Sequence, residues 1–82
     1  SLAFTNLPSA AIVQIFRPNG TLMRTLRSQG AMTVAWDLHT DRARVIGPGL
    51  YRVRVLGRDS GGQPVPQQSF YIGLARAARE PR

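Results

Sequence analysis

The 82-residue sequence contains no cysteine, no lysine and a single histidine, and each scarcity excludes something. Without cysteine, neither a disulfide nor a thiolate metal site can stabilise the fold, although the compartment stays open. No run approaches the ~18 apolar residues of a membrane span, so we expect no membrane-spanning segment. No signal peptide is visible, and the start at Ser1 instead of Met indicates a processed or excised piece of a longer protein.

Acidic residues are also scarce, and the charge is therefore lopsided. Eleven basic residues, all arginine, stand against four acidic ones, for a net charge of +7. One interpretation is a surface selected for phosphate or carboxylate, because the guanidinium group binds both bidentately. The other is codon bias in a GC-rich genome, which also favours Ala, Gly, Pro and Val. The even spread of the arginines favours codon bias, but both interpretations remain open.

The chain is long enough for one small domain, and its apolar pattern predicts strands. Apolar and polar residues alternate with period two in short segments separated by turn residues, and no segment shows a helical period. The predicted strands cover residues 2–6, 11–17, 22–26, 31–36, 50–56 and 68–74, with a short edge strand at 45–46. Six or seven strands at turn spacings of roughly 8–12 residues are typical of a β-sandwich, and a small barrel is the alternative.

Residues 31–56 are predicted to form the centre of the fold, a core hairpin around Trp36, the only tryptophan. Its first strand alternates through Met32, Val34 and Trp36, and a polar loop follows. In its second strand Tyr51, Val53 and Val55 share one face, and Leu50, Arg52 and Arg54 share the other.

A second hairpin is predicted around the turn at residues 17–21, RPNGT, because Pro presets φ while Asn and Gly tolerate positive φ. Before this turn, Val13 and Ile15 are expected on the inner face, and Phe16 on the outer face with Gln14. After it the alternation is imperfect. We expect Leu22 and Leu26 inside with Met23 partly buried, or a β-bulge.

The predicted structural core combines these apolar faces with the last strand. It consists of Val13, Ile15, Leu22, Leu26, Val34, Trp36, Tyr51, Val53, Val55, Phe70 and Ile72. Residues 1–74 are expected to form the single domain, and the basic segment 75–82 is expected to fray.

The sequence offers no catalytic set. His39 has Asp37 and Asp41 two residues away on either side, but no serine in a strained strand-to-helix turn. The two aspartates are a poor start for a Ca²⁺ site because Arg42 and Arg44 flank them. We expect Asp37 to hydrogen-bond backbone N–H groups and fix the turn after Trp36. The prediction is a protein that is not an enzyme and holds no metal or cofactor.

The candidate contact residues are arginines on an outer face. Arg52 and Arg54 are expected there, with Arg24 near them, as the residues that meet a partner. Such a stripe could follow a phosphate backbone, but nucleic-acid binding by a sheet usually adds exposed aromatic side chains for stacking. A solvated face or docking to an acidic partner is therefore favoured over nucleic acid.

Several motifs together resemble a known family. A V-x-I-[FY] strand, here Val13, Ile15 and Phe16, leads through a turn to G-x-L-[VM]-R-T-L at residues 20–26. Trp36-Asp37 follows, then a polar loop and Pro48-Gly49-Leu50-Tyr51 with Val53 and Val55. This order resembles the immunoglobulin-like domain of the flagellar hook-capping protein. It is more similar still to small C-terminal β-sandwich modules of large exported bacterial proteins, including type IX secretion sorting domains.

The resemblance implies an all-β fold, an immunoglobulin/fibronectin III-like antiparallel β-sandwich of about seven short strands. It implies a non-catalytic module in the C-terminal part of an exported protein that is periplasmic, on the cell surface or extracellular. Its partners would be another protein or domains of its parent protein, in scaffolding, surface attachment or secretion targeting. The alternative function is a basic β surface that binds nucleic acid or acidic glycans.

Overall fold

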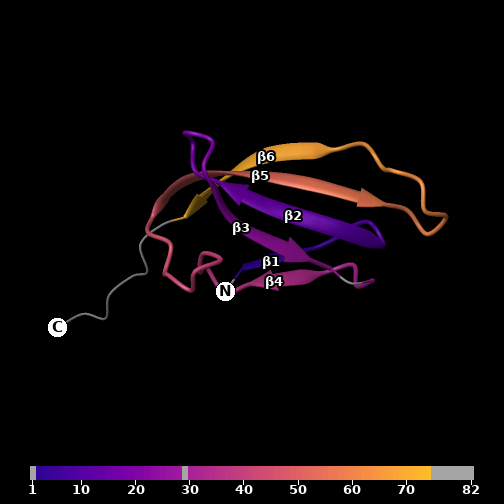
Figure 1. The fold of residues 1–82 in the computed structure, drawn as a ribbon, viewed down its shortest axis with the longest axis horizontal. Coiled ribbons are helices and arrows are strands. Elements are labelled where there is room, and N and C mark those ends of the chain that lie inside the picture. Colours follow the sequence, from indigo (N-terminus) through magenta and orange to yellow (C-terminus); the bar gives the residue numbers. More distant parts are fainter. Residues whose placement is uncertain (1, 29, 75–82) are drawn as a thin grey trace.

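The computed structural model describes residues 2–28 and 30–74, which form strands, turns and loops without a helix (Figure 1). Residues 75–82, with their expected fraying, lie outside the described residues. The strands are β1 (Leu2–Phe4), β2 (Ala10–Phe16), β3 (Leu22–Arg27), β4 (Val34–Trp36), β5 (Gly49–Arg58) and β6 (Gln68–Leu74). The predicted all-β class is confirmed. No helix in the described part of the chain is long and apolar enough to cross a membrane.

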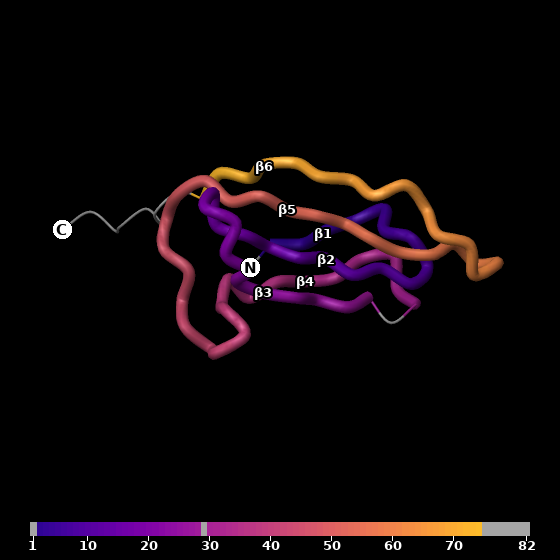
Figure 2. The backbone as a smooth tube through the Cα atoms, turned by 45° about the horizontal axis from the view of Figure 1, so that its top comes forward, coloured from indigo at the N-terminus to yellow at the C-terminus, as the bar shows by residue number. Residues whose placement is uncertain are grey.

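The strands form two antiparallel sheets. The larger sheet has the order β3-β2-β5-β6, and the smaller one pairs β1 with β4. Figure 2 shows that the loop between β4 and β5 projects at one end of the molecule and that the β5–β6 hairpin projects at the other. Since one hydrophobic cluster draws on both sheets, the arrangement is that of a β-sandwich.

The predicted hairpin of residues 31–56 is wrong. β4 pairs with β1, while β5 pairs with β2 and β6, so the two segments belong to different sheets. Each of the two strands has one apolar face. Placing these faces in opposite sheets buries them against each other, which lateral pairing in one sheet would not do.

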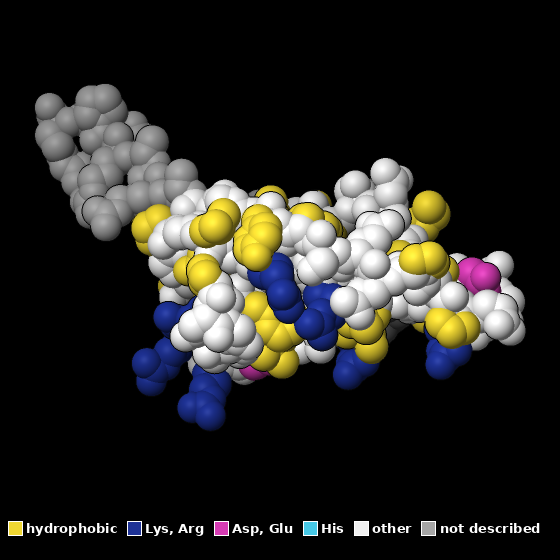
Figure 3. Space-filling view, turned by 90° about the horizontal axis from the view of Figure 1, so that it is seen from above, with side chains coloured by type: hydrophobic (Ala, Val, Ile, Leu, Met, Phe, Trp, Pro, Cys, Tyr) yellow, Lys and Arg dark blue, Asp and Glu magenta, His cyan; other side chains and the backbone are white. Residues whose placement is uncertain are grey.

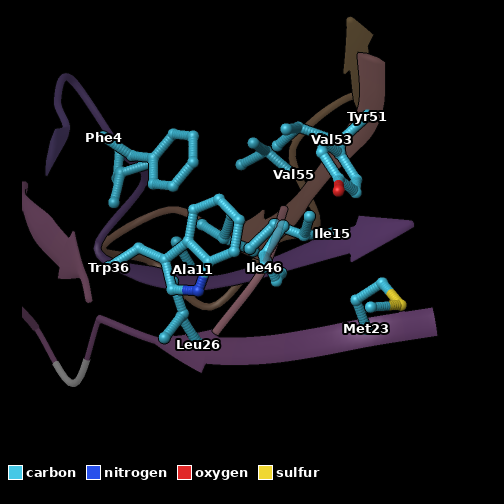
Figure 4. Close-up of a cluster of buried hydrophobic side chains, with 12 residues drawn as sticks. Phe4, Ala11, Ile15, Met23, Leu26, Trp36, Ile46, Tyr51, Val53 and Val55 are labelled. Carbon is cyan, nitrogen blue, oxygen red and sulfur yellow. The ribbon is translucent and has the colours of Figure 1, made fainter. Parts of the chain in front are cut away.

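The core lies between the sheets. Figure 4 shows the rings of Phe4 and Trp36, from the smaller sheet, directed toward side chains of the larger one. The predicted core residues that are buried are Val13, Ile15, Leu26, Trp36, Tyr51, Val53 and Val55, and the half-buried Val34 and Ile72 pack against them. Phe4, Leu7, Ala11, Met23 and Ile46 complete the buried hydrophobic cluster.

The prediction that Leu22 belongs to the core is wrong, because β3 contains a bulge. Leu22 pairs with Phe16 and Arg24 pairs with Ile15, which leaves Met23 as the extra residue. Met23 is therefore buried on the inner face, and Leu22 is 45% exposed on the outer face.

The core assignment of Phe70 is also wrong, for a different reason. Phe70 pairs with Val53 on the inner face of the larger sheet, as the alternation predicts, but it is 39% exposed. The smaller sheet has two strands against four, so it leaves the inner side of β6 partly uncovered.

Candidate interaction face

The outer face of the larger sheet carries the side chains that alternate with the core residues. The register places Phe16 beside Leu22 on one side and beside Arg52 on the other, and Arg52 lies beside Tyr71. We call these four residues the outer row. The outer row crosses all four strands, from β3 through β2 and β5 to β6.

Two arginines of β5 are arranged over one ring in this row. The guanidinium carbons of Arg52 and Arg54 lie 5.4 Å and 5.1 Å from the ring centroid of Phe16. The arginines are two residues apart on one strand, so both reach the same face. Each contact contributes about 0.5–1 kcal/mol at an exposed site. The ring thus favours the placement of two positive charges on this face.

These two charges are not neutralised within the described part of the chain. Across residues 2–28 and 30–74, Asp41 pairs with Arg24 and Asp37 lies beside His39, but no carboxylate pairs with Arg52 or Arg54. In Figure 3, arginine side chains lie next to hydrophobic ones, while acidic side chains appear only in small areas near the margin.

Exposed apolar side chains accompany the charges. Tyr71 is 63% exposed, and Leu22 and Leu50 are also exposed. Leu50 pairs with Gly73, which places it on the same outer face as Tyr71. Arginine and tyrosine with apolar groups match the composition of the centres of protein interfaces.

Arg24 lies away from this face. It pairs with Ile15 on the inner side of β3, where its Nη1 donates to the carbonyl oxygen of Thr40 at 3.0 Å. Its Nε lies 3.7 Å from Asp41 Oδ1. Arg24 was predicted near Arg52 and Arg54, but the bulge at Met23 turns it toward the loop after β4.

In that loop, residues 37–48, polar side chains hydrogen-bond to the backbone of the loop itself. Asp37 Oδ1 accepts the backbone N–H of His39 at 3.0 Å, as predicted for the turn after Trp36. The carbonyl oxygen of His39 accepts the indole N–H of Trp36 at 2.9 Å, and His39 Nδ1 lies 2.8 Å from the carbonyl oxygen of Asp37. Residues 2–28 and 30–74 contain no group of three or more His, Cys, Asp or Glu side chains that could hold a metal.

Three members of the outer row, Leu22, Phe16 and Tyr71, were absent from the sequence prediction of a contact site, and Leu22 was predicted to lie in the core. Phe16 was predicted on the outer face but not beside arginine, because that contact depends on the β2–β5 register. Tyr71 was identifiable in principle, since Phe70 and Ile72 on either side of it were predicted to point inward.

The fold and this face together define a small antiparallel β-sandwich with a basic outer face that also carries aromatic side chains. No family model, curated protein or solved structure matches the chain.

Proposed function

We propose that this protein is a non-catalytic, immunoglobulin/fibronectin III-like module that contacts an acidic protein surface through the outer face of its larger sheet. The observation that carries the proposal is the cluster of Arg52 and Arg54 over Phe16, without a paired carboxylate in the described part of the chain. A preformed positive patch of this kind favours encounter with an acidic partner and sets its orientation.

A local hydrogen bond supports the immunoglobulin-like part of the proposal. Immunoglobulin-like sandwiches carry a tyrosine near the start of a strand whose hydroxyl bonds to the backbone a few residues upstream. Tyr51, near the start of β5, donates its hydroxyl to the carbonyl oxygen of Gly47 at 2.7 Å. The sequence resemblance extends this to a parent protein that is exported from a bacterium, where the module would scaffold, attach or target it.

The balance of charge and apolar area supports a protein partner. Arginine and tyrosine are over-represented among the residues that dominate protein-binding energies. In the outer row, Arg52 lies between Phe16 and Tyr71, so a partner carboxylate that meets it would be flanked by apolar contacts. Such shielding from water strengthens a charge-assisted hydrogen bond.

The test replaces both outer-face arginines in the parent protein, as Arg52→Gln with Arg54→Gln. The matched control removes two exposed arginines of the loop, as Arg42→Gln with Arg44→Gln. We expect the first pair, and not the second, to reduce export or assembly of the parent. The first pair should also remove the chemical cross-links that the parent forms with its partner in cells. Normal export, assembly and cross-linking with the first pair would overturn the proposal.

A second candidate function is binding of nucleic acid or acidic glycans, and the exposure of Tyr71 in line with Phe16 favours it. Surfaces that bind single-stranded nucleic acid usually combine arginines with aromatic side chains on which the bases stack. The assay measures binding of single-stranded DNA, single-stranded RNA and heparin to the full chain at low salt. Binding that falls steeply with salt would establish this candidate, and no binding to any of the three would exclude it.

A further inference from the structure

Within residues 2–28 and 30–74, the smaller sheet ends in a free edge on the side of β1. In this part of the chain β1 pairs only with β4, and β4 contacts β3 at one side of the larger sheet. On the other side of β1, a groove separates the chain around Phe4 from β6. The smaller sheet therefore stops before it reaches the last strand of the larger one.

The exposure of two paired residues marks where the cover ends. Val53 on β5 is completely buried, whereas its cross-strand partner Phe70 on β6 is 39% exposed. Neighbouring strands are only about 4.8 Å apart, so the change occurs over one strand spacing. An additional strand beside β1 would lie over the position at which cover is lost.

The groove combines apolar and uncharged polar side chains. It has a volume of about 520 Å³, and its lining includes the apolar Phe4, Leu7, Val55, Val65 and Phe70 together with the polar Thr5, Asn6 and Gln68. None of its lining residues carries a charge, although arginines are numerous elsewhere in the chain. Its occupant should therefore present uncharged side chains, with apolar ones over the partly exposed Phe70.

We propose that this groove accepts an extended peptide segment of a separate polypeptide, which adds to the free edge of β1 as a third strand. An edge strand offers unpaired backbone N–H and C=O groups that bind an incoming strand, and pockets for alternate side chains supply specificity. Side chains at alternate positions of the peptide would cover Phe70. The inference goes beyond the proposed function, because it concerns the opposite face of the larger sheet and another kind of recognition.

Charge argues against the chain's own last residues as the occupant. Residues 75–82, ARAAREPR, include Arg76, Arg79, Glu80 and Arg82, so both alternate sets of positions contain a charge. The groove has no charged group to pair with them. A second copy would bring an edge strand together with its whole sandwich, whereas a single strand suits a groove of about 520 Å³.

The probe is a displayed library of random peptides of about 12 residues, selected on the full chain. We expect the selected sequences to carry apolar residues at alternate positions and to show NMR contacts with β1. Phe70→Lys should weaken their binding about tenfold or more. The matched control Ser69→Lys adds the same charge on the preceding residue of β6, which is exposed on the outer face and does not line the groove, and it should leave the binding unchanged. Trp36 fluorescence verifies that both variants are folded.

Four results would overturn the inference. The first is a selection that yields no binder dependent on Phe70, and the second is a set of binders lost only when Arg52 and Arg54 are replaced. The third is a concentration-dependent dimer that Phe70→Lys abolishes, which assigns the groove to a second copy. The fourth is NMR contact between residues 75–82 and β1 in the free chain. None of these results changes the outcome expected in the export assay of the outer-face arginines. Each proposal can therefore fail without the other.

Discussion

Trp36 is the largest side chain with which the smaller sheet packs against the larger one. It is completely buried, and its indole N–H is bonded to the carbonyl oxygen of His39. We expect Trp36→Ala to destabilise the fold by about 3–5 kcal/mol, against a total near 5–15 kcal/mol for small domains. Trp36→Phe retains a ring and should lose clearly less. Urea unfolding followed by far-UV circular dichroism measures both, and a loss below about 1 kcal/mol for Trp36→Ala would contradict the expectation.

The two tyrosines provide a matched pair at the same scale. Tyr51 is buried and its hydroxyl donates to Gly47, whereas Tyr71 is exposed on the outer face. Tyr51→Phe should cost about 0.5–1.5 kcal/mol, because it removes a hydrogen bond and leaves the carbonyl without that donor. Tyr71→Phe should change stability by no more than about 0.5 kcal/mol. Equal effects of the two changes in urea unfolding would show that the Tyr51 hydroxyl does not hold the start of β5.

The residue-level predictions succeeded where strict alternation decided the face. Val13 and Ile15 on β2, and Val53 and Val55 on β5, were predicted inside and are buried. Leu22 failed because one extra residue in a strand reverses the face of everything on one side of it.

At the scale of elements, the start of β2 and the end of β5 approach each other closely at Gly57. A Cβ added there would lie 2.7 Å from the carbonyl oxygen of Ala10 and 3.0 Å from the ring of Pro8. Gly57→Ala should therefore cost about 1–3 kcal/mol, since backbone must shift. Gly73 on β6 has nothing within 4 Å of the same added atom, so Gly73→Ala is the control and should be neutral or slightly stabilising. Thermal unfolding of both variants tests the difference, and a neutral Gly57→Ala would contradict the close approach.

The loop of residues 37–48 is hydrogen-bonded to β3. Arg24 of β3 donates to Thr40, and the carbonyl oxygen of Met23 accepts the backbone N–H of Asp41 at 3.0 Å. We expect Arg24→Gln to speed hydrogen exchange in residues 39–46 while leaving exchange in β2 and β5 unchanged. Arg27→Gln, on the same strand but exposed, is the control. Uniform acceleration across all strands would instead assign Arg24 a role in global stability.

The pairing of elements was the part of the fold that the sequence could only partly specify. The turn at residues 17–21 predicted the β2–β3 hairpin, which the structure contains. A period of two identifies the apolar face of a strand but not the sheet that will contain it. β4 and β5 were therefore placed in one hairpin, although they belong to opposite sheets. The partial exposure of Phe70 was likewise not predictable, because it depends on how far the other sheet extends.

At the scale of the whole molecule, β5 serves the core and the outer face at once. Its inward residues Tyr51, Val53 and Val55 are buried, while Arg52 and Arg54 face outward over Phe16. The positions of the two charges therefore follow from the packing of the strand that carries them. A contact surface fixed by the core in this way needs little ordering when a partner binds.

The same dependence predicts that both sheets unfold together. A two-stranded sheet is at best marginally stable alone, and Trp36 places the largest side chain of the smaller sheet in the common core. Removing β1 and β4 would in turn expose the inner faces of β2 and β5 to water. We therefore expect a single transition in urea, with Trp36 fluorescence and far-UV circular dichroism superimposing. The slope should be about 1 kcal/mol per molar urea, as for other small domains. A fluorescence transition at lower urea than the dichroism transition would show instead that the smaller sheet separates first.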